Sequence, residues 1–409
     1  MRRYGWVIWV FSTLGFLFSV PGQTMGMAVF TDYLIEALTL SRTELSIAYL
    51  VGTLLSALCL PRAGRLFDVH GGRVMMAGSS ILLALVLLYI TQVAELQRFA
   101  GGSVAAGWCL ILIGYFGVRF LGQGVLTSAS RNILLIWFVK RRGLVSGVRG
   151  VFVSLGFALA PLLIAMLIAA RGWQGALWVM AIGLLLFGVL AWIFVRSAPE
   201  VTPVAPSTNQ VESEGSSQSG HTLAEVKRSS LFWLYASSLS IHALFGTALT
   251  FHIVSIFEQA GRSSAEAFAY FLPAAVCSTV VNLIGGYWAD TRRLKPFLIV
   301  MLASFLFGAG GLVMLDTTAG YWSLAIGFGC GGGLWGVISN LAFVRYFGTR
   351  HLGEVSGLNT ALTVSASAVG PAVFSLGLDG WGSYDLPIYL CMTVLMGLLV
   401  WAWVQPAPE

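Results

Sequence analysis

The chain has 409 residues, of which 57% are hydrophobic and only 10% are charged, and its net charge is +6. Soluble globular proteins carry about 25% charged residues, so this composition excludes a cytosolic enzyme, a disulfide-rich secreted scaffold and a disordered chain. We therefore expect an integral membrane protein. The five cysteines show neither paired nor metal-ligand spacing, and we expect them to be small apolar residues within helices.

Twelve stretches are long and apolar enough to cross a membrane as helices, which takes about 20 residues each. In chain order they cover residues 5–34, 42–61, 72–93, 107–138, 142–169, 173–196, 231–259, 265–289, 296–315, 321–346, 351–378 and 384–404. The expected fold class is therefore an all-α membrane protein with twelve transmembrane helices.

Lysine and arginine are distributed unevenly between the two sides of this predicted topology. If the N-terminus is inside, only Arg42, Arg98, Arg171 and Arg262 of the 23 basic residues fall in outer loops, and most of the others fall in inner segments. Such an excess marks the cytoplasmic side of a membrane protein. We expect a multi-pass protein of the cell membrane, cytoplasmic or inner, with both termini in the cytoplasm.

One segment interrupts the apolar pattern. Residues 197–228 are rich in Ser, Pro, Glu and Gln, which is typical of a solvated linker, and the last eight of them indicate a short amphipathic helix. This segment predicts three parts: an N-terminal six-helix bundle over 1–196, a cytoplasmic linker over 197–228 and a C-terminal six-helix bundle over 229–409.

The two predicted bundles repeat each other at two constant offsets. An offset of 222 relates Ser41-Arg-Thr-Glu44 to Ser263-Ser-Ala-Glu266, Glu36 to Glu258, and Gly64 and Asp68 to Gly286 and Asp290; an offset of 210 relates Ser146-Gly147 and Pro161 to Ser356-Gly357 and Pro371. Both Ser-to-Glu segments fit capping boxes at a helix start. Parallel six-helix repeats predict two pseudo-symmetric bundles with the substrate site near the membrane midplane.

Four segments resemble motifs of the major facilitator superfamily. Gly64-Arg-Leu-Phe-Asp-Val-His-Gly-Gly-Arg73 is similar to the signature between helices 2 and 3 of that family, and Gly286-Tyr-Trp-Ala-Asp-Thr-Arg-Arg293 is its degenerate copy. Arg119-Phe-Leu-Gly-Gln-Gly124 resembles the RxxxGxG motif of helix 4, here with glycines at positions 122 and 124, and Gly156 to Pro161 resembles the Gly/Pro-rich stretch of helix 5. The resemblance covers the whole chain and implies the major facilitator fold and solute transport.

Within that family the chain most resembles the monocarboxylate and oxalate/formate transporter branch. Tyr4-Gly-Trp-Val-Ile-Trp9 is similar to the helix 1 opening of the branch, and Trp137-Phe-Val-Lys-Arg-Arg-Gly-Leu-Val-Ser-Gly147 to its helix 5 opening. However, Asp32 stands about where the branch has a functional lysine, and Ser278 and Asn282 stand where it has a helix 8 aspartate and arginine. The resemblance therefore implies the fold but neither a lactate-type substrate nor its proton coupling.

Arg131 is the most informative polar residue in the predicted membrane helices. It lies about seven residues, or about 10 Å, from the cytoplasmic end of the fourth helix. The seven-residue spacing of Gly117, Gly124 and Arg131 predicts one smooth helix face, which suits a cavity wall. Arg131 is therefore a candidate substrate-binding residue with a planar fork for a carboxylate. The alternative is a structural arginine that bonds carbonyl groups or extends towards the membrane surface.

Other polar residues are candidates for substrate binding or proton coupling. Neutral substrate contacts are expected from Gln23, Tyr49, Asn282, Asn340 and Asn359. Candidates for proton coupling are Asp32, Arg119 and His242. Each of these three has an alternative: Asp32 as a solvated helix end, Arg119 as a structural residue that reaches Gln123, and His242 as a neutral core histidine. Arg149 is a weaker ligand candidate, because it lies near a helix end and can extend towards the cytoplasm.

The signature motif and its copy are candidates for a conformational gate. Its expected members are Gly64, Asp68, Arg73 and Asp290. We expect Asp68 and Arg73 to pair in one conformational state and to separate in the other.

Together these features predict a secondary transporter that moves a small organic solute, an anion such as a carboxylate, by alternating access. A proton is the candidate co-transported ion, which makes symport the expected mode, and membrane lipid is the other expected partner. We expect a monomer with no nucleic-acid partner. We also expect no cofactor, no metal and no catalytic residue, because no phosphate loop, zinc spacing or nucleophile motif occurs. The alternatives are a transport-inactive sensor or receptor with the same fold, and a transporter of a neutral or drug-like solute.

Overall fold

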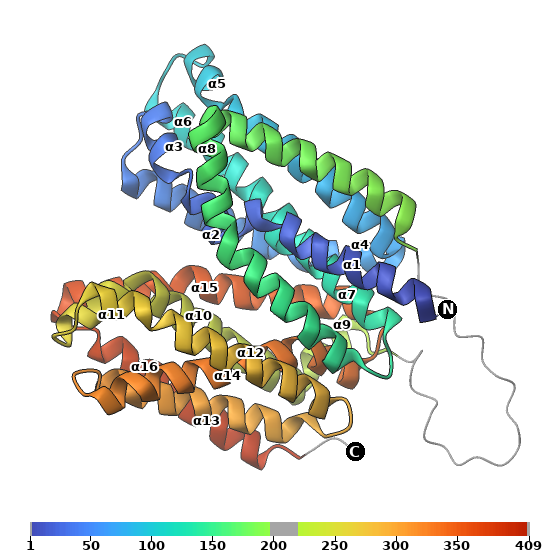
Figure 1. The fold of residues 1–409 in the computed structure, drawn as a ribbon, viewed down its shortest axis with the longest axis vertical. Coiled ribbons are helices and arrows are strands. Elements are labelled where there is room, and N and C mark those ends of the chain that lie inside the picture. The colour runs from blue at the N-terminus through green and yellow to red at the C-terminus, as the bar shows by residue number, and fades with distance from the viewer. Residues whose placement is uncertain (1, 197–219, 407–409) are drawn as a thin grey trace, which may run out of the picture. The chain divides into compact units, whose positions relative to one another are not determined.

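The computed structural model describes residues 2–196 and 220–406, and in these ranges the regular elements are helices (Figure 1). The longer helices are α1 (Arg2–Phe18), α4 (Arg42–Thr91), α6 (Val104–Val118), α7 (Thr127–Trp137), α8 (Arg142–Phe194), α10 (Ser230–Gln259), α12 (Phe271–Ala289), α13 (Leu294–Val313), α14 (Thr318–Phe347), α15 (Leu352–Trp381) and α16 (Asp385–Val404). The shorter ones are η1 (Val20–Gly22), α2 (Thr24–Ala28), α3 (Thr31–Leu38), α5 (Val93–Phe99), η2 (Arg119–Leu126), α9 (Leu223–Arg228) and α11 (Ser264–Ala269).

Ten helices of the described chain are long and apolar enough to cross a membrane. Two of them, α4 with 50 residues and α8 with 53, are more than twice the length that a bilayer core of about 30 Å needs. Each contains one glycine with non-helical dihedral angles, Gly71 (φ 77°) in α4 and Gly172 (φ 71°) in α8. Figure 1 shows α8 folding back on itself. Each of these helices therefore holds two predicted spans, which reconciles the ten helices with the twelve predicted segments.

The first predicted span, 5–34, is wrong as a single helix. The structure breaks it into α1, η1, α2 and the start of α3. Pro21 lacks a backbone N–H and therefore removes one hydrogen bond of an α-helix at this point. Gly22 permits a close approach, because a Cβ there would lie 2.6 Å from the Cα of Gly122.

The predicted span 107–138 is helical up to Trp137, but its centre is a π-helix, η2, where hydrogen bonds run from i to i+5. The smooth face predicted from Gly117, Gly124 and Arg131 is not found. A Cβ on Gly117 or Gly124 would press against a side chain of α4, so both glycines serve close helix packing, and Gly124 also lines a small cavity.

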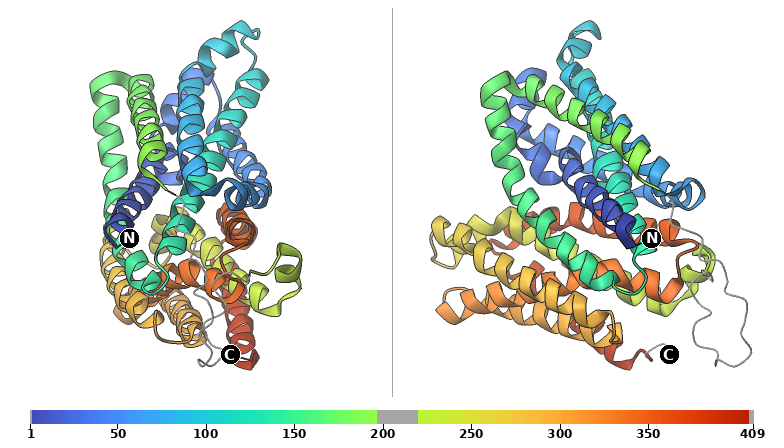
Figure 2. Two further views of the ribbon diagram at one scale, coloured as in Figure 1. Left: turned by 90° about the vertical axis from the view of Figure 1, so that its right-hand side faces the viewer. Right: turned by 45° about the vertical axis from the view of Figure 1, so that its right-hand side comes forward.

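The described chain forms two compact units. Unit 1 comprises Met1–Val139, Phe152–His221 and Phe347–Ala361, and unit 2 comprises Lys140–Val151, Thr222–Tyr346 and Leu362–Glu409. In unit 1, α4 packs along α6 and η2, and α1 packs along α7; in unit 2, α16 packs along α13 and α10 (Figure 2). The predicted division into 1–196, 197–228 and 229–409 stays a prediction. Of its linker, residues 197–219 lie outside the described residues, and residues 223–228 form α9.

Both predicted capping boxes are confirmed. In the first, the backbone N–H of Ser41 donates to the Glu44 carboxylate at 2.8 Å, and the N–H of Glu44 donates to Ser41 Oγ at 3.2 Å. In the second, the matching distances between Ser263 and Glu266 are 3.0 and 3.3 Å. Each box satisfies N–H groups that have no partner within the first helical turn.

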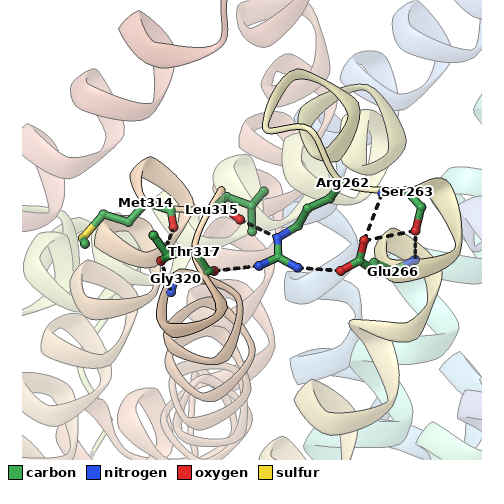
Figure 3. Close-up of polar contacts among 7 residues, drawn as sticks. All are labelled: Arg262, Ser263, Glu266, Met314, Leu315, Thr317 and Gly320. Atoms are coloured by element: carbon green, nitrogen blue, oxygen red, sulfur yellow. Dashed lines mark hydrogen bonds and ion pairs between the residues drawn. The ribbon is translucent and has the colours of Figure 1, made fainter.

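Arg262 ties the second capping box to the connection between α13 and α14 (Figure 3). Its side chain is 14% exposed. One end of the guanidinium donates to Glu266 at 2.5 Å, and the other atoms donate to the carbonyls of Leu315 at 2.5 Å and Thr317 at 2.7 Å. The arginine therefore links two connections that are about fifty residues apart in sequence.

Candidate functional site: a polar row on the fourth predicted helix

Arg119 is buried in unit 1, with 3% of the residue exposed, where the broken first span meets η2. Its guanidinium donates to the carbonyl of Gly22 at 3.0 Å and to Thr53 Oγ1 at 3.1 Å, and lies 5.1 Å from the ring centre of Tyr49. The carbonyl of Gly22 is available because the helix breaks there. The predicted bond from Arg119 to Gln123 is wrong, since the guanidinium turns to η1 and α4 instead.

Gln23 and Tyr49 lie at the same break. The amide nitrogen of Gln23 donates to Ser19 Oγ at 3.1 Å and reaches Thr127 Oγ1 at 3.5 Å. Tyr49 donates its hydroxyl to Thr24 Oγ1 at 2.9 Å. The structure thus brings two of the predicted neutral contacts to the helix that carries Arg119 and Arg131.

Four polar side chains follow one another at four-residue intervals along this helix: Arg119, Gln123, Thr127 and Arg131, which we call the polar row. In a regular α-helix residues four apart drift by about 40° per step, which would separate the ends of the row by about 120°. The i→i+5 bonds of η2 place more residues in each turn and reduce that drift. Arg119 and Thr127 accordingly both contact the segment around Gly22 and Gln23.

Arg131 is partly buried and has no hydrogen bond, ion pair or ring contact with any residue in the described ranges. Neighbouring polar atoms on the same helix are also buried without a partner: Gln123 Oε1, Ser128 Oγ, Ser130 Oγ and Asn132 Oδ1. Buried polar groups are normally hydrogen-bonded. These unsatisfied atoms make the helix around Arg131 a candidate for contact with water or a ligand.

A small cavity of about 10 Å³ lies beside this wall, lined on α7 by Ser128 and Asn132. Its volume is at the lower limit for a single water molecule. Within unit 1 the described chain therefore holds no enclosed space of the size of an organic solute at this point.

Asn282 and Asn340 form a second polar cluster, in unit 2, together with Arg149. Arg149 is buried, with 3% exposed, and donates to Asn340 Oδ1 at 3.0 Å. The amide nitrogen of Asn340 donates to the carbonyl of Gly336 at 2.6 Å, and that of Asn282 to the carbonyl of Gly333 at 3.0 Å. The expectation that Arg149 extends towards the cytoplasm is wrong, because its guanidinium is buried against Asn340.

A signal for Arg149 was present in the sequence. The repeat offset of 210 pairs it with Asn359, so both repeats carry a polar side chain at this position. Asn359 is buried in unit 1, with 2% exposed.

The proton-coupling candidates have very different surroundings. The Asp32 side chain is 78% exposed and pairs with Arg42 at 2.5 Å, as expected for a solvated helix end. His242, in unit 2, stacks on Phe305 with ring centres 4.2 Å apart, and its Nδ1 is buried without a partner. Asp32 is therefore exposed and already paired, whereas His242 has a buried ring nitrogen without a hydrogen-bond partner.

The signature motif forms a helix cap rather than an internal ion pair. Asp68 accepts hydrogen bonds from the N–H groups of Gly353 (2.7 Å) and Glu354 (2.9 Å) at the start of α15. Asp68 and Arg73 do not pair in this structure: Arg73 donates to the carbonyl of Trp192 at 2.6 Å and lies 4.6 Å from its ring centre. Their pairing in another conformational state stays a prediction.

The degenerate copy repeats this cap in unit 2. Asp290 accepts from the N–H groups of Gly143 (2.6 Å) and Leu144 (3.0 Å) at the start of α8. A Cβ on Gly286 would lie 2.6 Å from the carbonyl of Gly143, and one on Gly64 would clash with the carbonyl of Gly353. Each glycine therefore allows the start of the capped helix to approach closely. The glycines and aspartates of the two caps are related by the offset of 222, and the capped N–H groups are related by the offset of 210.

The first cap carries an ion pair that the second lacks. Arg65 donates to the Glu354 carboxylate at 2.5 Å, with the Glu354 side chain 10% exposed. The corresponding positions in the second repeat are Tyr287 and Leu144. In the described ranges no group of three or more His, Cys, Asp and Glu residues is placed to hold a metal ion.

Comparison with known proteins agrees with the fold and the motifs. The chain is 25% identical over 287 residues to a 2-nitroimidazole transporter of Escherichia coli (66% of this chain, 67% of that one), and 24% identical to a probable sulfoacetate transporter of Cupriavidus necator (87% and 85%). The crystal structure of the E. coli fucose:proton symporter has a similar fold, with a TM-score of 0.66 at 15% identity over 98% of this chain and 100% of that one. The Major Facilitator Superfamily matches residues 11–371. The chain therefore belongs to the Major Facilitator Superfamily and is a multi-pass membrane transporter rather than an enzyme.

Proposed function

We propose that this transporter moves a small organic anion, such as a carboxylate, by alternating access, and that Arg131 binds the anionic group. One observation carries the proposal: Arg131 is a partly buried guanidinium without a protein partner in the described chain. A charge inside a membrane protein is costly unless it is paired or hydrated. A planar anion would accept two parallel hydrogen bonds from the guanidinium fork.

The polar row supplies further contacts for such a solute. Thr127 lies one turn from Arg131, and Gln23 approaches Thr127 from the broken first span. Gln123 adds a buried carbonyl oxygen without a partner. We propose that Gln23, Gln123 and Thr127 contact the neutral part of the solute, while Arg119 holds the break of the first span in place through Gly22.

The relatives agree with more than one solute class. The name of the C. necator relative refers to sulfoacetate, an organic anion, whereas that of the E. coli relative refers to 2-nitroimidazole. The similar fold of a fucose:proton symporter supports a proton as the co-transported ion here, and we propose His242 as the residue that accepts this proton. Kinship with the monocarboxylate and oxalate/formate branch, an inner-membrane location with both termini in the cytoplasm, and a monomeric state remain parts of the same proposal.

The two aspartate caps are proposed as the conformational gate. Asp68 and Asp290 each hold two backbone N–H groups at the start of another helix, with Gly64 and Gly286 at the points of close approach. Release of these hydrogen bonds would free the capped helices, and Arg73 contributes by fixing the end of α8 through Trp192.

Substrate binding by the variant Arg131→Lys tests the proposal. Lysine keeps the charge but loses the fork, and truncation of a charge-assisted contact costs about 2–5 kcal/mol, which lowers affinity more than tenfold. Acetate, lactate, oxalate and sulfoacetate, with 2-nitroimidazole as the neutral probe, are screened by thermal shift, followed by counterflow in proteoliposomes for each solute that stabilises the protein. Arg42→Lys, at the exposed ion pair, is the matched control.

The expected result is that an anion stabilises the wild type and Arg42→Lys, and that Arg131→Lys loses this effect at an unchanged melting temperature without solute. Unchanged affinity in Arg131→Lys would remove Arg131 from the site. Stabilisation by the neutral probe alone would favour a transporter of neutral solutes instead.

A further inference from the structure

Two cysteines that are 53 residues apart in sequence meet in unit 2. Cys277 lies on α12 and Cys330 on α14, and their sulfur atoms are 3.2 Å apart. The sequence spacing does not indicate this pair. Cys59, Cys109 and Cys391 are also free thiols, and no sulfur contact is recorded for them in the described chain.

Glycines on α14 bring the two thiols together. A Cβ on Gly329 would lie 2.8 Å from the Cβ of Cys277, and a Cβ on Gly333 would lie 2.5 Å from the carbonyl of Ser278. The two backbones therefore pass at close range over this stretch. Both thiols are partly exposed, so a small uncharged reagent can reach them.

We propose that Cys277 and Cys330 form an oxidation site at which hydrogen peroxide produces a disulfide between α12 and α14. One cysteine, as its thiolate, attacks an oxygen of hydrogen peroxide, breaks the O–O bond, forms a sulfenic acid and releases water. The second thiol then attacks the sulfenic sulfur, forms the S–S bond and releases a second water, so one molecule of hydrogen peroxide oxidises two thiols. The sulfur atoms must approach by about 1.2 Å to reach the disulfide length of about 2.05 Å.

The disulfide would act on the polar cluster of unit 2. Asn282 lies five residues beyond Cys277, about 7.5 Å along α12, and it already donates to Gly333, three residues beyond Cys330 on α14. A covalent bond at the cysteines fixes the spacing of the two helices next to this hydrogen bond. The proposal goes beyond solute transport and does not depend on the identity of the solute.

Hydrogen peroxide treatment of the purified full-length protein tests the site. Free thiols are counted by alkylation and intact mass before and after treatment, and again after reduction with a phosphine, and digestion then identifies the cross-linked peptides. We expect the wild type to lose two of its five thiols reversibly and to yield a peptide that joins Cys277 to Cys330. Cys109→Ser, which removes an exposed single thiol, should behave in the same way.

Cys277→Ser and Cys330→Ser should each abolish the cross-link, while their unoxidised melting temperatures stay equal to that of the wild type, which shows that they fold. The proposal is wrong if the wild type accumulates oxidised thiols without a 277–330 cross-link. It is also wrong if reversible loss of two thiols persists in Cys277→Ser.

Discussion

The cap at Asp290 allows one interaction to be measured on its own. Each carboxylate oxygen accepts one N–H at the start of α8, from Gly143 at 2.6 Å and from Leu144 at 3.0 Å. Arg141, which directly precedes the start of α8, has no side-chain acceptor that could replace the Asp290 carboxylate. In Asp290→Asn, one oxygen is replaced by an NH₂ group that faces an N–H donor, so one hydrogen bond is lost and the charge at the helix start is removed.

The expected cost follows from these two losses. A hydrogen bond to a charged group contributes about 1.5–3 kcal/mol, and an anion at a helix N-terminus about 0.3–1 kcal/mol. Since Asp290 is partly exposed and water can reach the freed N–H, we expect the lower half of the combined range, about 2–3 kcal/mol. A tenfold change in an equilibrium constant corresponds to about 1.4 kcal/mol, so the ratio of folded to unfolded protein should fall more than tenfold in Asp290→Asn.

Thermal unfolding of the purified protein in detergent, followed by tryptophan fluorescence, measures this loss. Asp290→Asn should melt several degrees below the wild type, and Asp68→Asn should fall less, because the Arg65 to Glu354 ion pair still holds the start of α15. The control is Asp316→Asn, because Asp316 is exposed and its side chain has no hydrogen bond or ion pair with any described residue. A melting temperature of Asp290→Asn equal to that of this control would refute the capping argument.

Two further predictions concern close packing and the Arg262 link. Gly286→Ala should destabilise the protein, because the new Cβ would lie 2.6 Å from the Gly143 carbonyl. The control Gly310→Ala, with open space around the new Cβ, should stabilise the protein by about 0.5–1 kcal/mol. Equal melting temperatures of the two variants would contradict the close approach at Gly286. Arg262→Lys cannot bridge two carbonyls and a carboxylate at once, so we expect a loss of about 1–3 kcal/mol in thermal unfolding, against almost none for the exposed Arg42→Lys. Equal losses in the two lysine variants would remove Arg262 as a structural link.

Much of the helical framework could be predicted from the sequence, because a membrane requires about 20 consecutive apolar residues and internal bonding of every backbone group. The capping boxes at Ser41 and Ser263 were predictable for a local reason, since both partners of each box lie within one helical turn. The constant offsets also anticipated that Asp68 and Asp290 would have matching surroundings. What they contact was not predictable, because Gly353 and Gly143 lie far away in the sequence.

The amino-acid sequence by itself determined where this chain can cross a membrane, where its helices begin and which residues carry charge inside them. Only the tertiary structure decided that the first span breaks near Pro21 and that η2 brings Arg119 and Thr127 to that break. It also decided that Arg149 donates to Asn340, while Arg131 has no hydrogen-bond or ion-pair partner among the described residues. The reason is physical: apolar length and capping act over a few residues of one segment. The partner of a buried polar group depends instead on which backbones approach each other, and the glycines set those approaches between segments that are distant in the sequence.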